Sequence, residues 1–438
     1  MGAPNGPQAP RVARSAPAKP WRSSTPSTLA RAPGDPGRGS TLDDLRRIIR
    51  RIESSRPPRP APAPVESVVG GELVETGAGG LVRVRREFAL SHLHGRLPLA
   101  EAFGLSPDAL RLLAGPAEPP ADPRRLLFLD TETTGLAGGT GTYAFLVGAG
   151  RLDGDRFVVE QYFMRDFDDE PALLAVLGPI LAEASGIVSF NGTGFDLPLL
   201  ETRFVLARQR WPAAVAHLDL LRPARRVWAA SLIDCRLTTL ERDVLGLVRG
   251  DDVPGALIPA LYFDFLRFRR AAPLAGVFAH NRDDVLSLAA LLGWFGGAVA
   301  RADGLELAPE ALAGLGRLWE RLDPERAAAC YQEALETGLS GDLAHAVRLG
   351  LARWEKRRAR WEAACALWET ASRAEIFDPL PWEELAKFHE HRSRDVARAR
   401  SVVTAALDLA RGAGAPARIL EAFSHRLGRL DRRLAPLR

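Results

Sequence analysis

The 438-residue sequence predicts a mixed α/β domain, preceded by a disordered tail and followed by an all-α helical-repeat domain. In residues 124–298, three strand-like apolar runs follow one another and later strands alternate with helices, which favours a mixed sheet flanked by helices. Residues 307–412 are helical in pattern and rich in Ala, Leu and Trp. Residues 1–40 are rich in Pro, Ala, Ser, Gly and Arg and lack a hydrophobic period, as disordered segments do.

The N-terminal tail, residues 1–65, carries most of the positive charge. Residues 1–60 hold 12 basic and 4 acidic side chains, whereas the whole chain has a net charge of +4, so the remainder is slightly acidic. A short helix is predicted at about 41–54, and a Pro-rich linker follows it. The tail could hold nucleic acid through its phosphates, or it could be a solubilising leader without a specific partner.

The composition gives no sign of secretion, a membrane span or a disulfide framework. The three cysteines, Cys235, Cys330 and Cys365, form no CxxC pair, so a zinc knuckle is not indicated either. The most apolar stretch, 285–300, is shorter than the roughly 18–20 residues that a spanning helix needs. The first residues lack the charged-then-apolar pattern of a signal peptide. We therefore expect a cytoplasmic protein without a membrane partner.

Residues 66–120 alternate briefly between apolar and polar side chains and predict a small β-rich lead-in. His92 and His94 in its "HLHG" stretch lack a third ligand at a metal-like spacing and are expected to be structural. The α/β domain is predicted at 121–300. Its strands are expected at 126–130, 142–150, 157–163, 186–191 and 216–221, and its helices at about 170–184, 196–209 and 273–295.

The C-terminal region, 305–438, contains a repeat. Its aromatic position moves from Trp319 to Trp354 to Phe388, in steps of 35 and 34 residues. This period resembles tetratricopeptide-type helical pairs, although the Pro that ends a standard repeat is missing or shifted. The resemblance implies a small α-solenoid that serves for packing or for binding a protein partner.

The first candidate site motif is "FLDTETTGL" (128–136), in which an apolar strand ends in two acids. Asp130 and Glu132 are two positions apart and point to one face of the strand, while Thr131 points to the other. Neighbouring carboxylates repel each other unless a positive charge lies between them, and oxygen ligands of this kind favour Mg²⁺ or Mn²⁺. Taken alone, a pair of solvated acids at a strand end is the commoner interpretation.

Two further segments carry acids at defined places. In "SFNGTGFDLPLL", Asp196 opens a helix after a Gly-rich turn, where an Asp is also a good N-cap. In "HNRDDVLSL", His280 and Asp284 interrupt the apolar face of a helix at i, i+4 spacing, so a buried carboxylate there needs a partner. Asp283 lies about 100° around the helix and is expected to be solvated.

Together, these motifs resemble the DEDD exonuclease group of the ribonuclease H-like fold, and most closely the YprB-type ribonuclease H-like proteins. The resemblance covers about residues 124–296. It implies a ribonuclease H-like fold and a metal-dependent 3′–5′ exonuclease that hydrolyses phosphodiester bonds at single-stranded nucleic acid ends. The alternatives are a ribonuclease H-like endonuclease, and a catalytically idle nucleic-acid-binding or scaffold protein that uses its helical repeats for partner binding. The stretches that carry the resemblance are "LLFLDTETTGLAGGTGTYAFLVG", "SFNGTGFDLPLL", "HLDLLRPARRVW", "LERDVLGLVRGDDVPGALIP" and "HNRDDVLSL".

The resemblance also implies roles for individual residues. Asp130, Glu132, Asp196 and Asp284 would hold two Mg²⁺ or Mn²⁺ ions about 3.5–4 Å apart on the scissile phosphate. His280, four residues before the last acid, would be the general base or would orient the attacking water.

The substrate-binding candidates are Asn191, Phe195 and Thr131. Asn191 and Phe195 match positions that line the single-stranded end in the proofreading domains of B-family polymerases. Thr131 lies between the two acids of the first strand, but its opposite orientation leaves a structural role open. Asp219, at the end of a later strand, is open between a supporting role at the site and a structural one. The expected substrate is DNA or RNA, because no reader of the 2′-hydroxyl is visible.

Overall fold

We describe the protein from a computed structural model, which covers residues 46–47, 63–135, 140–212, 216–300 and 307–435. The chain divides into two units, Met1–Ala61 and Pro62–Arg438, and nearly all described residues belong to the second. The predictions for the tail and for its helix at 41–54 fall almost entirely outside the described residues.

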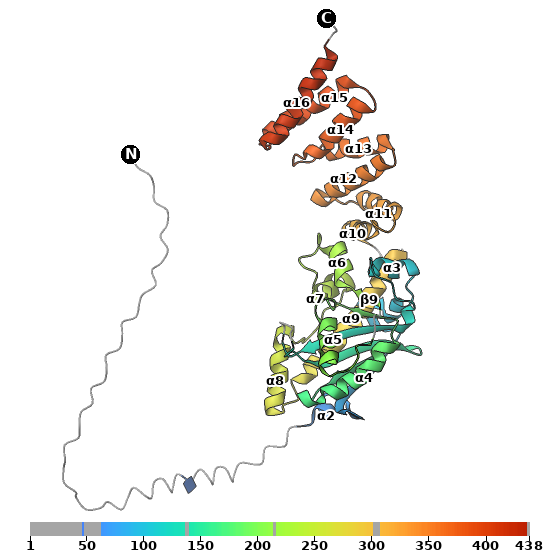
Figure 1. The fold of residues 1–438 in the computed structure, drawn as a ribbon, viewed down its shortest axis with the longest axis vertical. Helices are drawn as coiled ribbons and strands as arrows, with labels where there is room; N and C mark the ends of the chain where they lie inside the picture. The colour runs from blue at the N-terminus through green and yellow to red at the C-terminus, as the bar shows by residue number, and fades with distance from the viewer. Residues whose placement is uncertain (1–45, 48–62, 136–139, 213–215, 301–306, 436–438) are drawn as a thin grey trace, which may run out of the picture. The chain divides into compact units, whose positions relative to one another are not determined.

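Among the described residues, a seven-stranded mixed sheet organises the α/β domain, as predicted (Figure 1). Its strands are β1 (Glu72–Thr76), β2 (Gly79–Ala89), β5 (Leu126–Thr133), β6 (Ala144–Asp153), β7 (Arg156–Phe163), β8 (Gly186–Ser189) and β9 (Ala216–Asp219). Their order across the sheet is β1-β2-β7-β6-β5-β8-β9. Strand β5 lies in the interior, where it pairs antiparallel with β6 and parallel with β8.

The segment 66–120, which the sequence predicts as a lead-in of its own, shares the sheet of the α/β domain. Strand β2 pairs antiparallel with β7, and β1 pairs with β2 at the edge of the sheet. Leu81, Val82 and Val84 of β2 are buried, so this strand adds to the core and pairs the edge that β7 would otherwise expose. The segment also contains a short hairpin of β3 (Leu93–His94) and β4 (Leu97–Pro98).

Helices cover both faces of the sheet, and alternate side chains of β5 face the two layers. The helices of the domain are α2 (Val65–Val69), α3 (Pro107–Ala114), α4 (Glu170–Glu183), α5 (Asp196–Leu206), α6 (Leu221–Trp228), α7 (Leu237–Leu240), α8 (Ile258–Phe268) and α9 (Leu274–Ala300). Leu127 and Leu129 belong to one core with α4, α5 and α8. Leu126 and Phe128 belong to another core with α3 and the second half of α9. The two acids at the end of β5 therefore point to the face that α9 covers.

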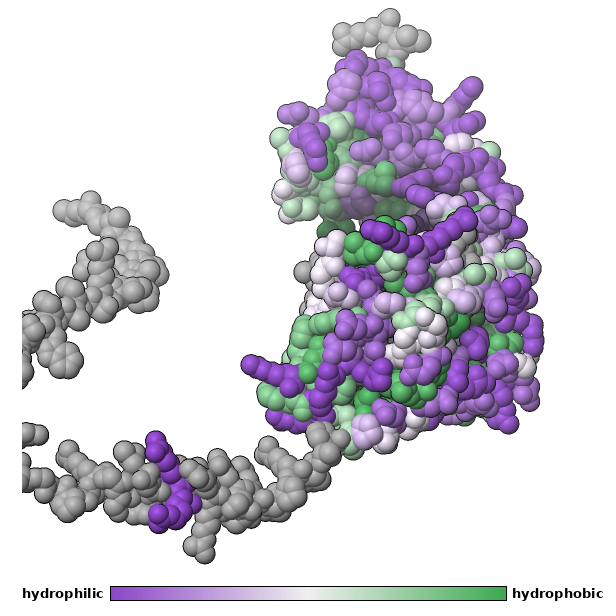
Figure 2. Space-filling view, turned by 60° about the horizontal axis from the view of Figure 1, so that its bottom comes forward, coloured by the Kyte–Doolittle hydropathy of each residue, from purple (hydrophilic) through white to green (hydrophobic). Residues whose placement is uncertain are grey.

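Helix α9 runs through the core of the domain. It has 27 residues, so the apolar stretch that the sequence analysis judged too short lies within a longer helix. By length and composition α9 could cross a membrane, but 72% of its most apolar window is buried inside the protein. On the face drawn in Figure 2, hydrophilic residues are interspersed with apolar patches. Asn281 and Ser287 are fully buried in α9 and therefore need hydrogen-bond partners.

Among the described residues 307–435, seven helices form the C-terminal region and pack as consecutive neighbours. They are α10 (Pro309–Trp319), α11 (Pro324–Glu336), α12 (Gly341–Arg357), α13 (Trp361–Ala371), α14 (Pro379–His391), α15 (Val396–Gly412) and α16 (Ala417–Leu434). Helix α10 packs on α6. The two helices lie close together, because a Cβ added to Gly314 of α10 would stand 2.4 Å from the Val227 carbonyl oxygen of α6. The helical region is thus confirmed, and its tetratricopeptide character stays a prediction.

Candidate active site

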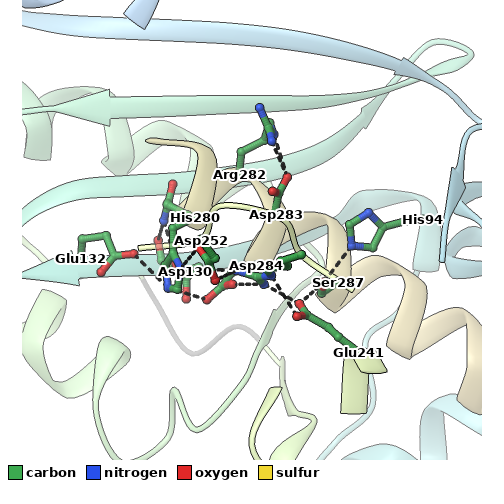
Figure 3. A network of polar contacts seen from close by, with 12 residues as sticks. His94, Asp130, Glu132, Glu241, Asp252, His280, Arg282, Asp283, Asp284 and Ser287 are labelled. Carbon is green, nitrogen blue, oxygen red and sulfur yellow. Dashed lines mark hydrogen bonds and ion pairs between the residues drawn. The ribbon is translucent and has the colours of Figure 1, made fainter. Parts of the chain in front are cut away.

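Asp130 and Glu132 stand at the carboxyl end of β5, on the face that α9 covers (Figure 3). Burial is the main cause that raises the pKa of both carboxyls, and the neighbouring charge of Asp284 raises it further. The pKa of Glu132 reaches about 9. Ionising these carboxyls together is therefore unfavourable unless a positive charge joins them.

Asn281 of α9 fixes Asp130, a contact that the sequence analysis missed. The Asn281 side chain is fully buried, and its Nδ2 donates to Asp130 Oδ2 at 2.8 Å. Its Oδ1 accepts a hydrogen bond from Gln161 Nε2, also at 2.8 Å. Gly148 of β6 leaves the necessary room, because a Cβ there would stand 2.4 Å from Asn281 Oδ1. The signal in the sequence was a polar residue beside His280 on a mostly apolar helix.

His280 and Asp284 lie on one face of α9, as their spacing predicts, and they face the acids of β5. His280 Nε2 is 3.9 Å from Glu132 Oε1 and 3.7 Å from Asp284 Oδ2. On the other side of the ring, Nδ1 is 2.8 Å from Asp252 Oδ1. A carboxylate at Nδ1 favours the tautomer with its proton there, which leaves the lone pair of Nε2 directed toward the acids. Asp252 was not among the predicted site residues.

Asp196 is the first residue of α5 rather than its cap, because Phe195 holds the N-cap position. Its Oδ1 accepts a 2.5 Å hydrogen bond from Thr131 Oγ1. Burial raises the pKa of Asp196 to about 6, and the bond from Thr131 opposes that shift. The charge of Asp196 also raises the pKa of Glu132, so Asp196 lies at the border of the cluster. Thr131 is buried against Asp196, which favours its structural alternative over a substrate contact.

The Gly-rich turn between β8 and α5 is held by Asp219 of β9. Asp219 Oδ1 accepts from the Asn191 amide at 2.8 Å, and Oδ2 accepts from the Thr193 amide at 3.1 Å. Asn191 has a φ of +66°, which Asn adopts more readily than most residues. Asn191 is exposed and Phe195 is half-buried, so both predicted substrate contacts can be reached from solvent. Asp219, whose role the sequence left open, thus positions this turn.

Arg249, which was not among the predicted site residues, reaches the acidic cluster from the loop at 246–254. Its side chain is only 9% exposed and forms ion pairs with Glu241 and Asp284. A further ion pair joins it to Asp252 at 3.3 Å. Burial raises the pKa of Asp284, and the charge of Arg249 opposes that shift. A single arginine in a loop has no spacing signal, so only the fold reveals this contact.

A chain of polar contacts links the cluster to the hairpin of β3 and β4 (Figure 3). Glu241 binds Arg249 and also accepts a hydrogen bond from Ser287 Oγ. Ser287 in turn lies 2.8 Å from His94 Nε2. Burial lowers the pKa of His94 to about 4, so this ring is neutral at pH 7. His94 therefore has a structural place, as the sequence analysis expects.

The donor set of the cluster fits a hard divalent cation. Its side chains are carboxylates, whose oxygens Mg²⁺ and Mn²⁺ prefer. Burial and the neighbouring carboxylates raise the pKa of Asp130 and Glu132, so a cation would favour their ionised forms. In the part of the chain that the structure describes, however, no three His, Cys, Asp or Glu side chains are gathered closely enough to hold a metal ion. Asp284 is paired with Arg249 instead.

Comparisons with known proteins agree with this architecture. Residues 127–296 match a family model described as the RNase_H superfamily. The chain is 41% identical over 169 residues to a Bacillus subtilis (strain 168) protein with the name "Uncharacterized protein YprB". This match covers 38% of the chain and 40% of that relative, so it spans less than half of either protein. The family-model match lies within the α/β domain.

Proposed function

We propose that this chain, whose α/β domain is a YprB-type domain of the ribonuclease H superfamily, hydrolyses phosphodiester bonds of nucleic acids with the help of a divalent cation. The observation that carries the proposal is the position of His280 among the acids. Its Nε2 lies 3.9 Å from Glu132 and 3.7 Å from Asp284, beside carboxyls whose pKa values are raised. A base next to a cation-binding cluster supports hydrolysis of a phosphate ester.

Four acids would hold the cation: Asp130, Glu132, Asp284 and, at the border, Asp196. Bound Mg²⁺ or Mn²⁺, two ions by the resemblance, would lower the pKa of a water and neutralise charge on the phosphate. The protein contributes rigid placement, because β5 and α9 carry three of these acids on regular backbone.

His280 would accept the proton of the attacking water at Nε2. Its other nitrogen faces Asp252, which would stabilise the ring when it becomes charged. Asn281 keeps the carboxylate of Asp130 oriented through its 2.8 Å hydrogen bond. Asn191 and Phe195, on the turn held by Asp219, would contact the strand end.

We further propose that the reaction is a 3′–5′ exonuclease reaction on single-stranded ends. This finer assignment rests on the resemblance of the four-acid pattern to the DEDD group. The solvent access of the turn at Asn191 and Phe195, next to Asp196, supports a place for a strand end there.

Degradation of labelled oligonucleotides tests the proposal. With Mg²⁺ or Mn²⁺, 5′-labelled single-stranded DNA or RNA should give a ladder that shortens from the 3′ end, and EDTA should abolish it. A blocked 3′ end should stop the reaction. Internal fragments from circular single-stranded DNA would indicate an endonuclease instead. Intact strands with either metal would favour the nucleic-acid-binding or scaffold alternative.

A further inference from the structure

We propose that Arg249 is the resident counter-ion of the acidic cluster, and that a divalent cation has to displace it from Asp284 in order to bind. This inference rests on the proposed function, because it takes the cluster to be the cation site. It concerns a residue of the chain itself, and its consequence is a change in cation affinity that can be measured without any nucleic acid.

One side of the Arg249 guanidinium is anchored away from the cluster. Its Nε donates to Glu241 Oε2 at 2.9 Å, and its Nη2 donates to the other carboxylate oxygen of Glu241. Glu241 is almost completely buried and is held in turn by Ser287 Oγ. A two-point contact of this kind is the favoured geometry between an arginine and a carboxylate. The anchor therefore keeps the positive charge of Arg249 at the border of the site.

The other side of the guanidinium faces the acids. It forms an ion pair with Asp284 and lies 3.3 Å from Asp252 Oδ2. A carboxylate oxygen that is occupied by arginine donors is not open to a metal ion, and the two positive charges repel each other at such a distance. Among the described residues, no three His, Cys, Asp or Glu side chains are grouped closely enough to hold a metal ion, and Asp284 is turned toward Arg249.

The contacts of Arg249 allow an exchange without unfolding. An arginine has five N–H donors, so it can keep Glu241 while it releases Asp284. Its backbone lies in the loop between Leu245 and Gly255, outside any helix or strand. Since the pairing between Arg249 and Asp284 and the binding of a cation exclude each other, removing the Arg249 charge should tighten cation binding.

The test compares Mn²⁺ binding by calorimetry for the wild-type chain, Arg249→Met and a matched control, Arg282→Met. Arg282 lies next to the cluster on α9, but it pairs with Asp283. Arg249→Met should bind Mn²⁺ about tenfold more tightly than wild type, within the usual range of coupling between sites. Arg282→Met should stay within about twofold of wild type, because it removes the same charge without touching Asp284. Equal or weaker binding by Arg249→Met, or equal tightening by Arg282→Met, would overturn the inference.

A second measurement and a separate readout of the proposed function complete the test. If Arg249→Met does not fold, the Nη–H resonances of Arg249 in the wild-type chain, assigned through Arg249→Lys, should shift when Mg²⁺ is added, because an Nη group binds Asp284. Unchanged Nη–H resonances would overturn the inference. The oligonucleotide ladder tests the proposed function separately. A wild-type chain that binds Mn²⁺ and degrades strands, while Arg249→Met binds no more tightly, would refute the inference alone. Absence of Mn²⁺ binding in both proteins would refute the inference together with the cation site.

Discussion

Asp130 is held by two residues that act in different ways. Asn281 gives it a hydrogen bond, and Gly148 lets α9 approach β6 closely enough for that bond to form. A carboxyl with a raised pKa is costly to ionise, so its orientation has to be imposed by neighbours that do not move. The geometry of the site therefore depends on buried polar contacts as much as on the acids.

Replacing Asn281 by Ala should lower both stability and the rate of strand degradation. The change removes the donor to Asp130 and leaves Gln161 Nε2 with one acceptor fewer. Loss of such buried partners costs about 1–3 kcal/mol in the free energy of unfolding. Urea unfolding and the initial rate with Mn²⁺ measure the two effects. Wild-type values for both would show that Asn281 does not position the acid.

Buried His94 should make stability depend on pH. Its pKa in the folded protein is about 4, below the ordinary value of 6.5, so between these values the unfolded chain binds more protons. The contribution of His94 to the free energy of unfolding should therefore rise by about 3 kcal/mol as pH increases from 4 to 6.5, and it should be complete above 6.5. Measured by urea unfolding, the change in the free energy of unfolding from pH 4.5 to pH 7 should be less positive for His94→Gln than for wild type. An equal difference in both proteins would contradict the assignment.

At the scale of elements, apolar patterns predicted the strands and helices that carry the acids. The strand expected at 126–130 is β5, and the helix expected at 273–295 is α9, because each buries a long apolar face. The partners of these elements were harder to predict. Strand β2 pairs with β7, which lies far along the chain. The apolar pattern of a strand does not specify which other strand it pairs with.

Some site residues could not have been predicted from spacing. Arg249 and Asp252 lie on a loop without hydrophobic period, and Glu241 lies in the short helical turn before it. Their convergence depends on the path of that loop over α9. By contrast, the i, i+4 spacing of His280 and Asp284 is enough to predict that they share one face of their helix.

The contact between α10 and α6 gives a prediction for an element. In Gly314→Ala the new Cβ would meet backbone atoms of Val227, which cannot rotate away. The change should lower the free energy of unfolding by about 1–3 kcal/mol through overpacking. A matched control is Gly350→Ala on α12, where a Cβ would meet nothing within 4 Å. If Gly314→Ala is as stable as this control in thermal unfolding, the two helices do not pack as described.

At the scale of the whole molecule, charge is unevenly distributed along the chain. Residues 1–60 hold 12 basic and 4 acidic side chains, and the remainder is slightly acidic. A slightly acidic protein repels a polyanionic strand at long range, so a basic segment would raise affinity through the phosphates.

Deletion of residues 1–60 should therefore weaken binding to single-stranded DNA and RNA and reduce its dependence on salt. Each lost phosphate contact lowers the slope of log K against log salt by roughly 0.7 for a single strand. Fluorescence anisotropy between 50 and 200 mM salt measures both quantities. Unchanged affinity and slope after the deletion would mean that the tail takes no part in substrate binding.

The most direct test of the account is the product ladder of Asp130→Asn compared with wild type on a 5′-labelled single strand with Mn²⁺. The change keeps the shape of the side chain and removes the charge that would hold the cation. Asp283→Asn is the control, since Asp283 pairs with Arg282 and stands apart from the cluster (Figure 3). We predict a ladder for wild type and for the control, and a rate at least about a hundredfold lower for Asp130→Asn. A ladder of equal rate from Asp130→Asn would contradict the assignment of this cluster as the active site.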